Sequence, residues 1–309
     1  MPPLKAAPEL MNAARFHSEW MAEHDCLAHN CPGEPTWTQR IADAGYTDCI
    51  ALGENVAAGQ STASAAVQAW MNSTIGHREN MLNPGFREAG GGYASCATTQ
   101  YRPYWTLDLG ARNNVYPVII DNEDWSTSSL QVNLHVYGSD WATEMRFSND
   151  GVHWSEWETL STHKAWTLSC PVTSSATVYA EVTNGPTTLQ SSDDIHVDVP
   201  LSARPDLMVF LSEQGSAETV PASYQMAITC CESWSTNVTE DWIRLNQGAG
   251  SGPANVTANL DEGLPTDPGV HYATITVETS QGQVNVQVIL VLTDGPLDRT
   301  HLPLVTRNN

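Results

Sequence analysis

Apolar residues recur at helical spacing in the first third of the chain. A stripe with this spacing follows Pro8 and Glu9, residue types that favour a helix start. It consists of Leu10, Ala14, His17 and Met21. Further helices are predicted over Trp37–Ala44, Ser61–Met71 and, for a turn or two, 77–82, with strands over 91–95 and 104–109. The first third is therefore predicted to mix helices and strands.

Beyond residue 113 the period changes from the helical one to two, which is typical of half-buried strands. The alternation is clearest over 130–136, 178–182, 273–277 and 284–292. Several short strands separated by turn residues indicate β-sandwiches. The predicted fold class is therefore α+β: a mixed domain, then two all-β sandwich domains. The predicted boundaries are 1–113, 114–202 and 203–294, with a tail over 295–309.

The distribution of charge supports the same domain division and argues against nucleic acid as a partner. The chain of 309 residues has a formal net charge of −22. Residues 1–113 contribute −4 and residues 114–309 contribute −18, so the boundary separates two compositions. An excess of negative charge repels phosphates, which argues against nucleic-acid binding. No apolar run reaches the roughly 20 residues of a membrane-spanning helix.

Cysteine content bears on the compartment. Seven cysteines and only two lysines are typical of an exported protein. In contrast, the opening MPPLKAAPEL holds no apolar core of a signal peptide. We expect an extracellular or cell-surface protein whose signal segment is missing from this sequence. The sequence leaves the oligomeric state open.

Three polar residues of the first domain are candidates for chemistry: His29, Glu54 and His77. Two imidazoles and a carboxylate can bind zinc or another divalent metal and leave a position open for water or a ligand. The same groups can serve as a base and its orienting partner. Their spacing alone does not decide between these roles.

Eight sequence blocks lie around these residues, between about residues 8 and 110: AARFHSEWM, AHN, IADAGY, GENVAAG, AAVQAWMNS, GHRENML, REAGGGYA and YWTLDLG. In this order the blocks resemble the bacterial form of the CAP superfamily, the cysteine-rich secretory, antigen 5 and pathogenesis-related proteins. The resemblance implies an α-β-α sandwich with a surface cleft that holds two histidines and acidic residues, and a divalent metal in several members. It places the cleft histidines at His29 and His77 and a carboxylate at Glu54.

One family position departs from the pattern. The resemblance implies a second acidic residue after the helix tryptophan, which here falls on Asn72 or Ser73. Neither side chain is acidic, so a site of two histidines and two acids is not expected. Glu54 remains the candidate catalytic base if the cleft is catalytic.

Cysteines 26, 31, 49 and 96 fall in the same domain and allow three pairings. One of these joins Cys26 to Cys31 around His29 and Cys49 to Cys96, and we expect at least two bridges among the four. The alternatives are a Cys/His metal cluster at Cys26, His29 and Cys31, or a nucleophilic cysteine paired with His29. The fates of Cys170, Cys230 and Cys231 stay open, with a vicinal bridge between the last two as one option.

The two later domains resemble modules without obvious chemistry. MRFSNDGVHWSEWETL and ATVYAEVTN resemble Ig-like or fibronectin-like modules, and residues 207–293 resemble a BACON-type sandwich. The first resemblance implies spacing or adhesion, and the second implies glycan binding or spacing.

Three functions are compatible with these features. The favoured one is a secreted protein whose His/Glu cleft binds a divalent metal and a small or peptidic ligand. A metal-dependent hydrolase of peptide or cell-wall material is the second hypothesis. The third is an adhesin that binds glycans through the sandwiches and carries an inactive cleft.

Overall fold

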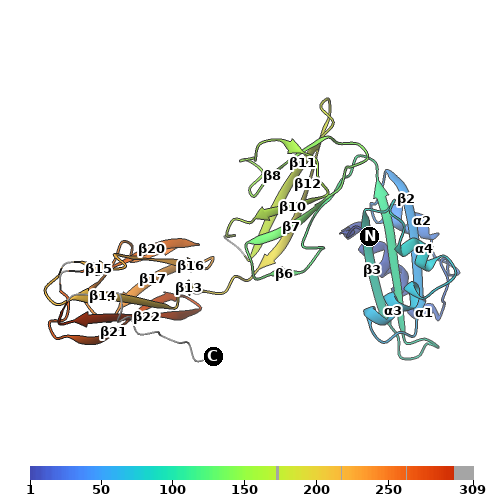
Figure 1. The fold of residues 1–309 in the computed structure, drawn as a ribbon. Helices are drawn as coiled ribbons and strands as arrows, with labels where there is room; N and C mark the ends of the chain where they lie inside the picture. Colours follow the sequence, from blue (N-terminus) through green and yellow to red (C-terminus); the bar gives the residue numbers. More distant parts are fainter. Residues whose placement is uncertain (172–173, 217, 262, 296–309) are drawn as a thin grey trace. The chain divides into compact units, whose positions relative to one another are not determined.

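The computed structural model describes residues 1–171, 174–216, 218–261 and 263–295. It divides into two compact units, Met1–Val197 and a second that begins at Asp198 (Figure 1). The predicted tail lies, from residue 296 on, outside the described residues. Among those residues, no helix is both long and apolar enough to cross a bilayer.

The N-terminal domain is built on one sheet with the strand order β1-β3-β4-β2. β1 runs parallel to β3, and the other neighbours are antiparallel. The elements are β1 (Lys5–Ala6), α1 (Pro8–His24), α2 (Trp37–Asp43), β2 (Cys49–Ala58), α3 (Ala63–Met71), α4 (His77–Met81), β3 (Glu88–Ser95) and β4 (Pro103–Arg112).

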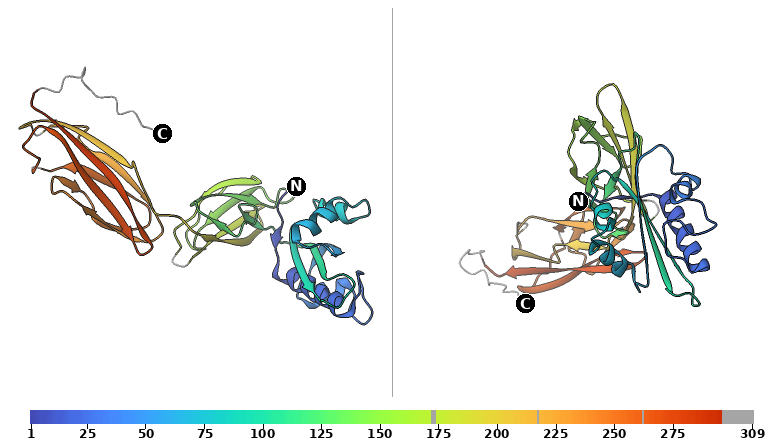
Figure 2. Two further views of the ribbon diagram at one scale, coloured as in Figure 1. Left: turned by 90° about the horizontal axis from the view of Figure 1, so that it is seen from below. Right: turned by 90° about the vertical axis from the view of Figure 1, so that its right-hand side faces the viewer.

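Helices cover both faces of this sheet, as the right-hand view of Figure 2 shows. Alternate residues of β4 point to opposite sides: Thr106 bonds Ser18 of α1, whereas Leu107 packs beside Trp70 of α3. α2 lies against α1, where Ile41 joins a buried cluster. The predicted mixture of helices and strands is therefore present, and its three layers bring α1, α2 and β2 together.

Helix α1 lies unusually close to the sheet because β3 carries glycines. Cβ atoms added at Gly90 and Gly92 would lie 2.1 Å from the backbone of α1. Gly91, which faces the other way, has open space around its Cβ position. The sequence GGG thus fixes the depth at which α1 docks, and with it the position of the buried face of α1.

The remainder of the first unit is β-rich, as the period-two pattern predicts. Two sheets have the orders β10-β7-β5 and β6-β12-β11-β8-β9. In β7 the alternation that we noted buries Val132, Leu134 and Val136. The strands are β5 (Val118–Ile120), β6 (Ser126–Thr127), β7 (Gln131–Val136), β8 (Glu144–Ser148), β9 (Glu158–Thr159), β10 (His163–Thr167), β11 (Ser175–Thr183) and β12 (Thr188–Val197).

The second unit is also formed of strands. Its sheets, β13-β16-β20-β18 and β15-β14-β22-β21-β17-β19, contribute to one apolar core that contains Met226 from the first and Phe210 and Leu290 from the second. The strands are β13 (Ser202–Arg204), β14 (Leu207–Glu213), β15 (Thr219–Val220), β16 (Tyr224–Thr229), β17 (Ser233–Val238), β18 (Ile243–Leu245), β19 (Ala249–Ser251), β20 (Ala254–Leu260), β21 (Gly269–Thr279) and β22 (Gly282–Thr293).

Candidate functional site

The three predicted site residues come from three different segments of the N-terminal domain. His29 lies in the irregular segment between α1 and α2, Glu54 lies in β2, and His77 is the first residue of α4. The side chain of His29 is 48% exposed, whereas that of Glu54 is only 2% exposed. The site is therefore a buried carboxylate with an accessible imidazole above it.

Glu54 is bonded through both of its oxygens. Its Oε1 lies 2.8 Å from Nδ1 of His29, and its Oε2 accepts from Nη2 of Arg40 at 2.7 Å. The hydrogen bond to Glu54 raises the pKa of His29 above its usual value. A carboxylate only accepts, so the proton of this contact is on Nδ1 of His29 and the lone pair of the neutral ring is on Nε2.

His77 is held by a different partner. Its Nδ1 lies 3.1 Å from Oγ of Ser73, and its carbonyl accepts from Nδ2 of Asn55 at 3.0 Å. Burial lowers the pKa of His77, and the positive charge of His29 lowers it further. A lowered pKa keeps His77 neutral, the form that binds metals.

The structure brings two of the three predicted residues into direct contact. Glu54 bonds His29, while the contacts found for His77 in the described residues are with other groups. Within the same part of the chain, no group of three or more His, Cys, Asp and Glu side chains is arranged to hold a metal ion. The three-ligand metal site therefore stays a prediction.

Sequence reasoning missed several buried polar groups behind His29. They are His17, Glu34, Arg40 and Asp108, all of them nearly inaccessible to solvent. One signal could have identified His17, because this residue lies on the apolar stripe of α1, where a histidine needs polar partners. Ser73 occupies one of the two positions where the family resemblance implies an acid, and it bonds His77 in that place.

Asp108 adds a second carboxyl next to Glu54. Its side chain is 1% exposed, and burial, followed by the negative charge of Glu54, raises its pKa well above the usual value. A carboxyl whose pKa is raised by folding binds its proton more tightly in the native state than in the unfolded chain. The free energy of unfolding therefore falls as the pH rises above about 4, the unfolded value, towards the folded pKa.

We expect Asp108→Asn to flatten this part of the pH profile, because the amide has the shape of the protonated carboxyl and no proton to lose. Urea unfolding between pH 4 and pH 8 measures the difference between wild type and variant. Asp43→Asn is the control, since Asp43 is exposed and should leave the profile unchanged. Parallel profiles for wild type and Asp108→Asn would contradict this assignment.

The cysteine pairing is confirmed for one bridge and wrong for the other. Cys26 and Cys31 form a disulfide, as one of the three pairings has it. Cys49 and Cys96 are both thiols. Cys49 pairs with Arg112 at one end of β4, and Ser95 pairs with Pro103 at the other, so nine residues of strand, about 30 Å, separate the two thiols.

The cysteines beyond the N-terminal domain do not form the vicinal bridge that we considered. Cys170 and Cys231 are each disulfide-bonded, whereas Cys230 has a thiol that points to the carbonyl of Glu232. The vicinal bridge between Cys230 and Cys231 is therefore absent. The alternative of a metal cluster at Cys26, His29 and Cys31 is excluded, because the disulfide consumes both thiolates.

An apolar groove of about 470 Å³ lies elsewhere on the domain. Ala66 and Trp70 of α3 form one wall, and Tyr93 and Trp105 of β3 and β4 form another. None of His29, Glu54 and His77 lines it, so the groove and the polar site are separate features.

Comparison with known proteins assigns the N-terminal domain. Residues 1–109 match the model of the cysteine-rich secretory protein family, CAP. The uncharacterized protein YkwD of Bacillus subtilis (strain 168) is 39% identical over 93 residues, which are 29% of this chain and 35% of YkwD. The chain thus spans about a third of the length of this curated relative.

Two solved structures are similar to part of this chain. An extracellular protein containing an SCP domain from Bacillus anthracis is 29% identical, with a TM-score of 0.32, over 37% of this chain and 35% of that protein. An outer surface protein of Borrelia burgdorferi is 22% identical, with a TM-score of 0.33, over 37% of this chain and 80% of that protein. The family match places a CAP domain at the N-terminus of this chain, followed by a β-rich remainder.

Proposed function

We propose that this CAP domain binds one divalent cation, zinc first among the candidates, through Nε2 of His29 and Nε2 of His77. The observation that carries the proposal is the shared geometry of the two rings. Each ring has its Nδ1 engaged by a neighbour, Glu54 or Ser73, and among the described residues neither Nε2 has a hydrogen-bond partner. Neutral imidazoles with this arrangement are the commonest zinc ligands in proteins.

In this proposal Glu54 orients His29. A carboxylate on the far nitrogen of a metal-binding histidine fixes the tautomer and makes the ring a better donor. Both oxygens of Glu54 are already bonded, to His29 and to Arg40, and the side chain is buried. Because the side chain is buried and engaged at both oxygens, its geometry favours the orienting role over that of a ligand or a general base in the hydrolase hypothesis.

The remaining coordination positions would take a small or peptidic ligand at the exposed side of His29. The β-rich remainder would act as spacer or adhesion modules, since every group of the site belongs to the CAP domain. We also propose an extracellular location. Cys26–Cys31 and the disulfide-bonded Cys170 and Cys231 support it, because disulfides persist in oxidising compartments.

Zinc titration of the full chain by calorimetry tests the proposal. We expect one zinc equivalent to bind wild type, and a loss of affinity of at least about 100-fold in His29→Ala/His77→Ala, because both donor nitrogens are gone. The control is His24→Ala, since His24 is an exposed histidine of the same domain. Equal zinc affinity in the double variant and in wild type would refute the site.

A further inference from the structure

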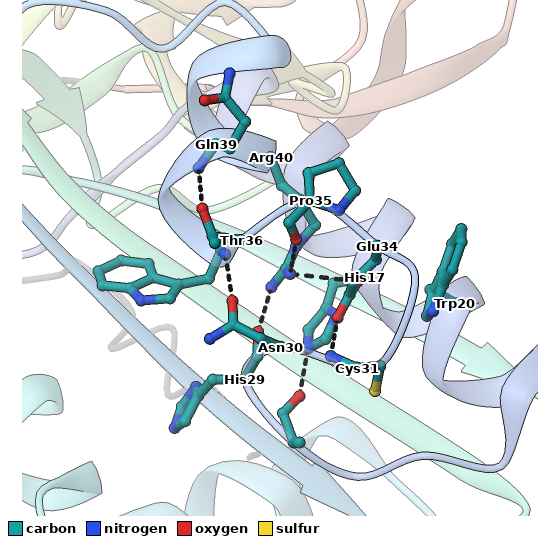
Figure 3. Close-up of polar contacts among 12 residues, drawn as sticks. His17, Trp20, His29, Asn30, Cys31, Glu34, Pro35, Thr36, Gln39 and Arg40 are labelled. Atoms are coloured by element: carbon teal, nitrogen blue, oxygen red, sulfur yellow. Dashed lines mark hydrogen bonds and ion pairs between the residues drawn. The ribbon is translucent and has the colours of Figure 1, made fainter.

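The segment that carries His29 has no regular secondary structure, yet every residue from Ala28 to Cys31 is held. The carbonyl of Ala28 accepts from Nε2 of His17 at 2.9 Å, and the carbonyl of His29 accepts from Nη2 of Arg40 at 3.0 Å. Oδ1 of Asn30 accepts from the backbone N–H of Trp37 at 2.8 Å. Figure 3 shows these bonds converging on the segment from α1 and α2.

Cys31 is held twice. Its backbone N–H donates to Oε1 of Glu34, and its sulfur is bonded to Cys26. The other oxygen of Glu34 lies 3.0 Å from Nδ1 of His17 and 3.2 Å from Nη1 of Arg40. Glu34 thus connects the loop to both helices, and with His17 and Arg40 it forms a set that we call the buried clamp.

The three side chains of the buried clamp depend on their bonds to one another, because they are shielded from water. The side chains of His17 and Glu34 are 0% exposed and that of Arg40 is 2% exposed, so water cannot replace a lost partner. Nε2 of His17 faces a carbonyl, which only accepts, so this nitrogen carries a proton. The contact between Nδ1 and the Glu34 carboxyl then needs a second proton between the two atoms. With that proton, His17, Glu34, Arg40 and Glu54 together sum to zero charge.

From these contacts we propose that His17, Glu34 and Arg40 are positioning residues that set the place of the His29 imidazole. His17 bonds the backbone carbonyl of Ala28, and Arg40 bonds that of His29. Arg40 also bonds Glu54, the carboxylate that orients the ring. One side chain therefore fixes both the backbone of His29 and the partner of its Nδ1. This inference deepens the proposed metal site and names the residues behind it.

Two substitutions of Glu34 separate positioning from mere packing. Glu34→Gln retains an acceptor for the Cys31 N–H and offers an amide N–H to Nδ1 of a neutral His17. It gives up only the pairing with Arg40, whose bonds to Glu54 and to the carbonyl of His29 remain. Glu34→Ala removes all three bonds. A third variant, Glu34→Asp, keeps the charge but is one methylene shorter, so it cannot span from Cys31 to His17, and it serves if the alanine variant does not fold.

The experiment measures zinc affinity and the imidazole N–H signals in the ¹H–¹⁵N spectrum of the full chain. We expect Glu34→Gln to bind zinc within about threefold of wild type and Glu34→Ala or Glu34→Asp to bind about 10- to 100-fold more weakly. The Nδ1–H signal of His29 should persist in wild type and Glu34→Gln and be lost in the other variants. Leu10→Val, a buried apolar change in the same domain that removes no hydrogen bond or ion pair of the clamp, should reduce stability without changing affinity.

The two readouts distinguish the failure of this inference from the failure of the proposed function. If wild type binds no zinc but its His29 signal is lost only in Glu34→Ala or Glu34→Asp, the metal site is refuted and the positioning role stands. If Glu34→Ala folds and retains the His29 signal, the positioning role is overturned. An equal loss of affinity in Leu10→Val would also overturn it, because destabilisation alone would then explain the effect.

Discussion

Gly90→Ala and Gly92→Ala are each expected to destabilise the CAP domain by about 3 kcal/mol or more, a large part of the stability of a typical domain. The added methyl would lie 2.1 Å from backbone atoms of α1: the N of Met11 for Gly90 and the O of Ala14 for Gly92. Backbone cannot move aside as a flexible side chain can, so α1 must lift from the sheet. Urea unfolding followed by tryptophan fluorescence measures the loss.

Gly91→Ala is the matched control, because the Cβ position of Gly91 has no neighbour within 4 Å. We expect this variant to be neutral, or slightly stabilising, since alanine restricts the unfolded chain more than glycine does. If the three variants unfold at the same urea concentration, the close docking of α1 on β3 is wrong.

Arg40→Leu is expected to have the second large effect: it should lower the free energy of unfolding by about 3–5 kcal/mol. Leucine fills much of the same space but leaves the carboxylates of Glu34 and Glu54 buried without their shared cation. It also removes the donors to the carbonyls of Pro35 and His29. Breaking a buried ion pair from one side is costly because the remaining charge cannot reach water.

The free energy of unfolding from urea titration measures this change, with Arg15→Leu as the control. Arg15 lies on α1 and is exposed, so its loss should change stability by no more than about 0.5 kcal/mol. An Arg40→Leu variant that is as stable as Arg15→Leu would mean that the buried clamp contributes nothing to the fold.

Local periodicity was enough to predict helices and strands, but not which distant side chains bond to one another. The stripe from Leu10 to Met21 predicts α1, and the alternation over 130–136 predicts β7, because burial of one face imposes a period on the residues themselves. The boundary of α3 near Met71 follows from the same signal. The family motifs added the order of the elements and the location of His29, Glu54 and His77.

The groups behind the site were not predictable in this way, because their partners are distant in the chain. Arg40 bonds Glu54 across 14 residues, and His17 bonds Glu34 across 17, with no repeating spacing to mark either pair. The expected Cys49–Cys96 bridge failed for a related reason. Strand register, which the cysteine spacing does not reveal, places the two thiols at opposite ends of β4.

Anomalous diffraction at the zinc edge, from crystals of the full chain soaked in zinc, tests the central claim most directly. We expect a single strong peak about 2.0–2.1 Å from Nε2 of His29 and from Nε2 of His77, with Glu54 still bonded to Nδ1 of His29. No peak between the two rings, or a peak that Glu54 ligates directly in place of His29, would contradict it.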